Sequence, residues 1–294
     1  MKLGAIFPTP EIGTDPAVIR DWAQAAEGLG YDSIVTYDHV LGAVHAGREP
    51  ALTGPYTERD AFHEPLVLFG YLAAVTERIE LATGVLILPQ RQTALVAKQA
   101  AEVDILSGGR LRLAVGTGWN WVEYDALGQP FESRGRRLSE QVELLRRLWR
   151  EPVIDFGGEF DRIDRAGILP QPGRIPIWFG GFSEVALRRA AQLGDGLMFG
   201  STPTRMAELC ERQKQLLAEA GRDAESFGLE AAVDFSQGPD VWRAELETWR
   251  ELGGTQLSLR AMDTTAVAVG FEEVGYRGPA DYIDALEKFR DAVR

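Results

Sequence analysis

Short apolar runs and longer amphipathic stretches alternate along the whole chain, and this alternation constrains the fold more than any other feature. The apolar runs predict eight buried strands, at residues 3–7, 33–37, 79–88, 111–116, 177–180, 197–199, 229–235 and 256–259. The amphipathic stretches predict a helix after each strand, at residues 17–29, 64–76, 94–107, 133–150, 183–193, 203–220, 239–252 and 279–293. Repeated βα units favour a parallel sheet covered by helices.

Eight unbroken pairs predict an α/β fold of the (β/α)₈ TIM-barrel type, formed by residues 1–294 as one domain. Helix-start signals support the boundaries, because Asp15-Pro16 and Thr202-Pro203 each place a capping oxygen before a proline. A doubly wound open sheet is the alternative. That fold usually carries a glycine-rich turn after its first strand, whereas Phe7-Pro8-Thr9-Pro10 follows here.

Three connections are too long to be simple loops, at about residues 39–63, 151–175 and 261–278. The first and third follow strands two and eight, so they lie at the C-terminal face of a barrel, where active sites form. We expect them to act as lids. The second precedes strand five and starts on the opposite face unless it folds back over the rim.

The charge balance excludes several classes of partner. Lys and Arg total 31 against 44 Asp and Glu, and the net charge of −13 repels nucleic acids and anionic membranes. Cys210 is the only cysteine, which excludes an internal disulfide and favours a reducing compartment. The longest apolar stretch, residues 85–89, is far too short to span a bilayer, so we expect a cytoplasmic protein with a small-molecule substrate.

Asp38 and His39 follow the second predicted strand, where side chains of a barrel can face an active site. Histidine is the side chain best suited to proton transfer near neutral pH, so His39 is a candidate acid or base. Two other interpretations stay open. Asp38 can cap the loop beside a hydrogen-bonded rim histidine, or Asp38, His39, His63 and Glu64 can form a divalent-metal site, which their spacing does not require. We predict no metal.

Three glycine-containing segments at strand ends are candidate ligand contacts. Thr83-Gly84-Val85 puts a glycine inside a buried strand, which marks a bulge or a close approach of backbone to ligand. Gly116-Thr117-Gly118, before Trp119 and Asn120, resembles part of a dinucleotide loop but lacks its third glycine. Gly180-Gly181-Phe182-Ser183 leads into a helix whose N-terminal N–H groups suit a phosphate, and a capped turn is the alternative.

Together these segments resemble the bacterial-luciferase-like superfamily of flavin- and deazaflavin-dependent oxidoreductases, over roughly residues 1–200 and more loosely beyond. The resemblance rests on residues 23–33 leading to Asp38-His39, on residues 83–85 through Lys98-Gln99, on residues 104–110 leading to 116–120, and on Gly180-Gly181 before the helix that ends near Asp195-Gly196. It is specific for the superfamily and much less specific for the substrate.

The resemblance implies a barrel, usually dimeric, that holds FMN or the deazaflavin coenzyme F-420 at its C-terminal mouth. Asp38 and His39 would then lie beside the reacting end of the ring system. Thr83, Gly84 and Val85 would lie behind the ring, with a cis peptide at Gly84–Val85 or one bond earlier. The implied contacts of the ribityl and phosphate tail are Gly116, Thr117, Gly118, Asn120, Gly180, Gly181 and Ser183.

One departure from the family bears on the activity. Its sugar-phosphate dehydrogenases carry a carboxylic acid directly after Gly-Thr-Gly, where this chain has Trp119, and Glu123 is only a distant substitute for that acid. We therefore do not expect that particular activity, and we keep Glu123 as a catalytic candidate with Asp38 and His39.

The coenzyme expected here is F-420, with hydride transfer to or from a small organic substrate. The chain has 4 lysines and 27 arginines, a bias that fits actinobacteria, in which deazaflavin enzymes of this type are abundant. An FMN-dependent monooxygenase that uses oxygen is the alternative, and a non-catalytic flavin-binding protein is a second one. The family resemblance also implies a homodimer.

Overall fold

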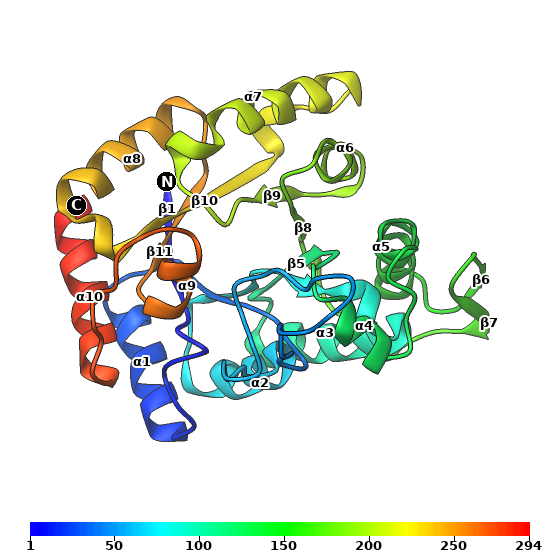
Figure 1. Cartoon of the computed structure of the whole chain (residues 1–294). Coiled ribbons are helices and arrows are strands. Elements are labelled where there is room, and N and C mark those ends of the chain that lie inside the picture. The colour runs from blue at the N-terminus through cyan, green and yellow to red at the C-terminus, as the bar shows by residue number, and fades with distance from the viewer.

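Parallel strands close into a barrel in the computed structural model, which describes residues 1–294 (Figure 1). The barrel strands are β1 (Lys2–Ile6), β2 (Ser33–Thr36), β3 (Glu80–Thr83), β5 (Leu111–Gly116), β8 (Ile177–Gly180), β9 (Gly196–Met198), β10 (Gly228–Asp234) and β11 (Gln256–Arg260). Pairing of β3 with β5 closes the barrel. The predicted fold class is confirmed.

The third predicted strand is interrupted. It divides into β3 and the short β4 (Leu86–Ile87), and the peptide bond between Gly84 and Val85 lies between them and is cis. A Cβ atom on Gly84 would lie 2.5 Å from Cγ1 of Val35, so only glycine fits this position. The expected cis peptide is thus confirmed at the first of the two expected bonds.

The eight long helices surround the barrel as predicted: α1 (Pro16–Gly28), α2 (Pro65–Val75), α3 (Thr93–Ser107), α5 (Arg134–Arg150), α6 (Glu184–Leu193), α7 (Pro203–Glu219), α8 (Pro239–Glu251) and α10 (Pro279–Val293). The Asp15 carboxylate accepts a hydrogen bond from the backbone of Ala17 and begins α1 as its sequence signal indicates. None of the helices combines the length and the apolar character needed to cross a membrane.

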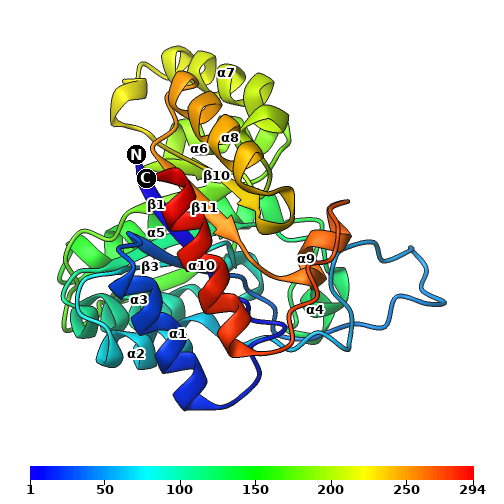
Figure 2. The same cartoon turned by 90° about the vertical axis from the view of Figure 1, so that its left-hand side faces the viewer.

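The long connections fold in two different ways. The connection before β8 forms a hairpin of β6 (Ile154–Gly157) and β7 (Arg162–Ala166), which lies on the outer side of α5 (Figure 1). Its tip is held there because the Glu140 carboxylate accepts hydrogen bonds from three successive backbone N–H groups, at residues 159–161. The other two connections lie at one end of the barrel with the short helices α4 (Trp121–Ala126) and α9 (Asp263–Ala268), as Figure 2 shows.

The barrel interior is closed below this end by an apolar layer and a buried ionic cluster. The apolar layer takes one side chain from each strand or strand end: Ile6, Val35, Ala82, Ala114, Trp178, Met198, Ala232 and Met262. Beneath it, the Arg112 guanidinium donates to Glu80 at 2.6 Å, to Glu230 at 2.7 Å and to Gln256 at 2.9 Å. Arg112 also lies over the Trp178 ring, 4.3 Å from its centroid. The interior is therefore a packed plug, and any site must lie at the strand ends.

Replacement of Arg112 tests the importance of this plug. Arg112→Met removes the cation that neutralises Glu230, whose side chain is only 1% exposed, so we expect the free energy of unfolding to fall by about 3–5 kcal/mol. Arg78→Met, at a side chain that is 71% exposed, is the matched control and should change stability by no more than about 0.5 kcal/mol. Urea denaturation measures both, and equal small losses would contradict a structural role for the plug.

Candidate active site

Three glycines at the ends of neighbouring strands form the floor of the barrel mouth: Gly84 after β3, Gly116 in β5 and Gly180 in β8. Ala114 and Trp178 face the interior, so alternation along β5 and β8 directs Gly116 and Gly180 inward as well. A Cβ on Gly116 would lie 2.5 Å from Cγ2 of Val85, and one on Gly180 would lie 2.6 Å from Cγ1 of Val85. The Val85 side chain thus lies over both glycines: Gly116 is buried beneath it, whereas Gly84, Val85 and Gly180 are partly exposed.

Alternation along β2 corrects the expected position of Asp38. Val35 belongs to the interior cluster and Tyr37 packs against it, so alternation directs Asp38 outward, between the sheet and the helices. Its side chain is almost fully buried, and it accepts hydrogen bonds from the Ile87 backbone at 2.8 Å and from Arg91 at 2.7 Å. Asp38 therefore does not face the mouth, and it anchors β4 and the segment that follows it instead.

The residues of the alternative metal site have other partners. Arg91 joins Asp38 to Glu64 at 2.7 Å, and Glu64 caps α2 by accepting from the Val67 backbone. The His63 ring is hydrogen-bonded to the Gly13 carbonyl at 3.0 Å. No group of three or more His, Cys, Asp or Glu side chains is arranged to hold a metal ion.

Three other predicted contacts have structural roles. The Thr83 hydroxyl is fully buried and hydrogen-bonds to both the N–H and the carbonyl of Ala114, so it joins β3 to β5 rather than lining the mouth. Asn120 caps α4 and is buried. Ser183 caps α6 by accepting from Ala186, which agrees with the capped-turn alternative for this residue.

The side chains of His39 and Glu123 lie in contact, although the two residues are far apart in the sequence. The turn into α4 brings its carboxylate back to β2, where Oε2 lies 3.1 Å from Nδ1 of His39. Oε1 accepts from the backbone N–H groups of Val40 and Leu41 at 2.7 and 3.0 Å. The fold thus forms an acid–imidazole pair at the mouth.

The environment keeps Glu123 ionised. Burial alone would raise the pKa of this carboxyl, but hydrogen bonds from His39 and from two backbone N–H groups outweigh it and hold the pKa below its usual range. An ionised carboxylate only accepts hydrogen bonds, so Nδ1 of His39 carries the proton between them. Nε2 makes no hydrogen bond within the protein and is the nitrogen left to exchange a proton.

Aromatic side chains enclose the His39 imidazole. Ring centroids of Phe62, Tyr56 and Trp119 lie 4.9, 5.2 and 5.5 Å from that of His39. Residues after β2 cross over Trp119 so closely that a Cβ on Gly54 would lie 2.5 Å from its ring. The connection after β2 therefore covers the His39 side of the mouth, as a lid would.

The two glycine loops expected to hold the coenzyme tail are both at the mouth. Thr117 and Gly118 are partly exposed, and the Thr117 carbonyl accepts a hydrogen bond from Tyr124 at 2.7 Å. Gly181 has φ +143° and a Cβ there would lie 2.7 Å from Cβ of Ala186 in the first turn of α6. This second loop thus passes close to a helix N-terminus, where backbone N–H groups favour an anion.

Sequence reasoning missed a further group of residues at the mouth. Tyr37 packs against the interior cluster, and Arg260 lies two residues before Met262, a member of that cluster. Nε of Arg260 donates to Asp234 Oδ2 at 2.9 Å. Burial raises the pKa of the Tyr37 hydroxyl, although the Arg260 guanidinium beside it acts in the opposite direction. The alternation of inward and outward residues in β2 and β11 is the signal that identifies both.

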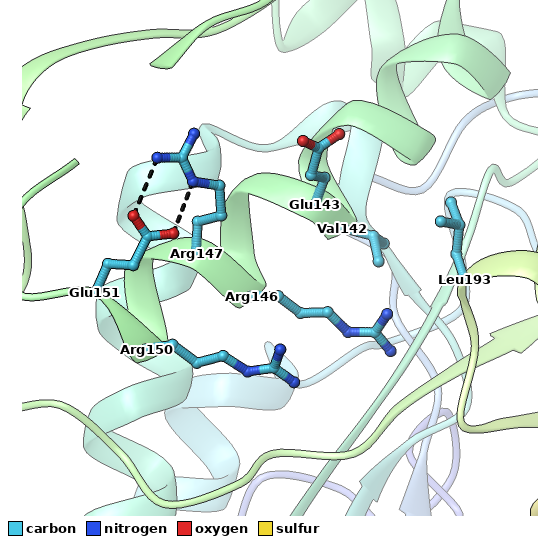
Figure 3. A pocket seen from close by; sticks show the side chains of 7 residues that line it. All are labelled: Val142, Glu143, Arg146, Arg147, Arg150, Glu151 and Leu193. Carbon is cyan, nitrogen blue, oxygen red and sulfur yellow. Dashed lines mark hydrogen bonds and ion pairs between the residues drawn. The ribbon is translucent and has the colours of Figure 1, made fainter. Parts of the chain in front are cut away.

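A groove on the outside of the molecule does not belong to this site. It has a volume of about 340 Å³ and lies between the C-terminal part of α5 and the end of α6 (Figure 3). Arg147 in its wall is bonded to Glu151, and Arg146 is paired with Asp195. Because barrel helices run opposite to the strands, their C-terminal ends lie at the face away from the mouth.

Comparison with known proteins gives a consistent result. A family model described as luciferase-like monooxygenase matches residues 1–286. The uncharacterised protein Mb0965c of Mycobacterium bovis is 36% identical over 222 residues, which cover 74% of this chain and 77% of that protein. Pyrimidine monooxygenase RutA of Escherichia coli is 34% identical over 199 residues, which cover 64% of this chain and 54% of RutA.

A solved structure shares the fold over the whole length. An F420-dependent secondary alcohol dehydrogenase, in complex with an F420-acetone adduct, superposes with a TM-score of 0.75 and 17% identity. The match covers 100% of this chain and 99% of the other. At this identity the likeness shows the common barrel.

The lowered pKa of Glu123 predicts a pH-dependent contribution to stability. The folded pKa lies below the ordinary value of 4.5, so the stabilisation is complete above that value and is lost as the pH falls through the folded pKa. Glu123→Gln should therefore lower the free energy of unfolding by about 1–3 kcal/mol at pH 7, and the loss should shrink below the ordinary pKa. The exposed Glu132→Gln is the control. A loss in Glu123→Gln that stays constant between pH 7 and the acid range, by urea denaturation, would argue against the ionised pair.

Proposed function

This chain belongs to the luciferase-like monooxygenase family, and on that premise we propose that it is an oxidoreductase that transfers a hydride between coenzyme F-420 and a small organic substrate at the barrel mouth. The observation that carries the proposal is the glycine floor at Gly84, Gly116 and Gly180, with the His39–Glu123 pair at the same mouth. Membership of a family of oxidoreductases indicates the class of reaction.

The residues present fit a flat ring with a phosphate tail. A side chain at Gly116 or Gly180 would collide with Val85, so the floor stays low enough for a planar ring to lie over it. We assign the ring to the surface of Gly84 and Val85. The ribityl and phosphate tail is assigned to Thr117 and Gly118 and to the N-terminus of α6, where Gly181 lets the backbone approach.

The chain's own residues would bind the coenzyme and exchange the proton that accompanies hydride transfer. F-420, when bound, supplies or accepts a hydride, and it reacts poorly with oxygen. Glu123 holds the imidazole of His39 in one orientation and fixes the proton on Nδ1, which leaves Nε2 to give or take the proton that accompanies hydride transfer. The aromatic side chains around His39 limit the access of water to this exchange.

FMN-dependent monooxygenation is the second candidate, because RutA, a relative at 34% identity, is named a pyrimidine monooxygenase. The same floor accepts either ring system. We favour F-420 because one proton-exchanging pair complements a two-electron hydride transfer, and because the arginine-rich composition agrees with that branch of the family. The expected homodimer and the cytoplasmic location are part of the same proposal.

Paired titrations of the purified protein separate the candidates. We expect F-420 to bind with a dissociation constant of about 1 μM or tighter, equivalent to about −8 kcal/mol, and FMN to bind clearly more weakly. Quenching of coenzyme fluorescence measures both. Protein that is purified with tightly held FMN and inserts oxygen in the presence of NAD(P)H would establish the monooxygenase instead. Stoichiometric binding of coenzyme with no turnover on any substrate would favour the non-catalytic alternative.

Substitution at Gly181 tests the assigned position of the phosphate. Gly181→Asp adds both a side chain near Ala186 and a negative charge, and it should abolish F-420 binding while the far-ultraviolet circular dichroism stays normal. Gly181→Asn has the same size without the charge, so it should bind F-420 at least about tenfold more tightly than the Asp variant. Equal affinities in the Asn and Asp variants, or parental affinity in Gly181→Asp, would place the phosphate elsewhere.

A further inference from the structure

Two cavities on the outside of the molecule share a pair of arginine side chains. Arg146 and Arg150 line the outer groove between α5 and α6, and they also line a second cavity of about 310 Å³. The second cavity adds Arg174 and Asp195, which directly precede the region of β8 and the start of β9. It therefore lies at the N-terminal ends of the strands, opposite the barrel mouth.

The three arginines of the second cavity have only one carboxylate among them. Asp195 accepts from Nη2 of Arg146 at 3.1 Å and from Nη2 of Arg174 at 3.2 Å. The same carboxylate also accepts from the backbone N–H of Ile177 at 2.9 Å. The exposed Arg150 side chain has no carboxylate partner. Since a guanidinium carries five N–H donors, most donors of these arginines have no acceptor in the protein.

The neighbouring Arg147 shows what an arginine with a purely structural role looks like here. It forms two hydrogen bonds to the Glu151 carboxylate, at 2.8 and 3.1 Å, and its charge complements the C-terminal end of α5. Arg146 and Arg150 extend side by side, apart from this pair (Figure 3). Arg174 comes from a segment outside α5, so the end of that helix does not account for its place in the cavity.

We propose that the second cavity, called the arginine cavity below, binds the phosphate group of a small phosphorylated molecule between Arg146, Arg150 and Arg174. A guanidinium stays charged and matches the geometry of phosphate oxygens with paired N–H donors. The organic part of the ligand is assigned to the adjoining outer groove, where Val142 and Leu193 form an apolar wall. This site is independent of the coenzyme, because it lies at the opposite end of the barrel.

The charge distribution selects a small anion. The wall of the arginine cavity carries three cations and one anion, whereas the chain has a net charge of −13. Glu143 of the outer groove points away from Arg146 and Arg150 (Figure 3). Charges in water are screened beyond about 8 Å at physiological salt, so a small anion responds mainly to the cavity itself. A nucleic acid or an acidic protein reaches further and meets the negative remainder of the surface.

Calorimetric titrations with inorganic phosphate and with phenyl phosphate test the proposal. We expect saturable binding of inorganic phosphate with a dissociation constant on the order of 1 mM or tighter. Phenyl phosphate should bind more tightly, because its ring covers Val142 and Leu193. Arg150→Gln removes a charged donor that no residue of the protein uses, so it should keep the fold and weaken both ligands at least about tenfold. Arg174→Gln should weaken them as well.

Arg78→Gln is the matched control. Arg78 also lies at the N-terminal ends of the strands, its side chain is 71% exposed, and it lines a different cavity. The variant therefore loses the same charge without touching the arginine cavity, and it should bind phosphate as the parent protein does. Equal weakening in Arg78→Gln and Arg150→Gln would reduce the effect to net charge and would overturn the proposal.

Binding of the phosphate probe at the barrel mouth is the competing result. Gly181→Asp, which is expected to block the phosphate of the coenzyme, should leave saturable phosphate binding in place. Loss of binding in Gly181→Asp, together with parental affinity in Arg150→Gln, would locate the phosphate at the mouth and refute the arginine cavity. A parent protein that shows no saturable phosphate binding refutes it too. None of these results depends on whether the protein binds F-420, so the proposed function is judged separately.

Discussion

The buried carboxylate of Glu123 determines the geometry of the barrel mouth. It accepts hydrogen bonds from the His39 ring, from the backbone at residues 40 and 41, and from Gln90 at 3.3 Å. A carboxylate offers about four acceptor sites, and all of them are used. Glu123 therefore has no capacity left for a ligand, and it acts through His39, whose Nε2 is free. The same bonds fix where the connection after β2 leaves the barrel and starts to cover the mouth.

The glycine floor and the plug beneath it close the barrel on the side opposite to the connection after β2. Val85 lies over Gly116 and Gly180 because neither has a side chain, and the plug around Arg112 closes the barrel beneath the apolar layer. A ligand can thus approach from one end only. The polar groups at that end fall into two sets, His39 with Glu123 and Tyr37 with Arg260 and Asp234. In the proposed function, the first set exchanges a proton.

Much of the fold could be predicted from the sequence, because apolar periodicity and helix caps are local signals. β5 and β8 begin and end at the predicted residues, and the helix of residues 279–293 is α10. The short helices α4 and α9 were missed because six residues are too few to show a helical period. The hairpin of β6 and β7 was missed because its strands are mostly exposed and lack alternation.

The site was predicted less completely, for a physical reason that differs between residues. Asp38 and Tyr37 are neighbours, and only the phase of alternation in β2 decides which faces the mouth. His39 and Glu123 are brought together by the turn into α4, a contact between distant segments that no local pattern reveals. The catalytic role of His39 and the coenzyme contacts of Gly84, Val85 and the two glycine loops stay predictions.

A crystal structure of the protein soaked with F-420 tests the central claim most directly. We predict electron density for the ring over Gly84 and Val85, within contact of His39 and Tyr37, and density for the phosphate at the loop of residues 180–183. Density for the phosphate at the loops after β10 or β11, or a ring bound outside the barrel mouth, would contradict it.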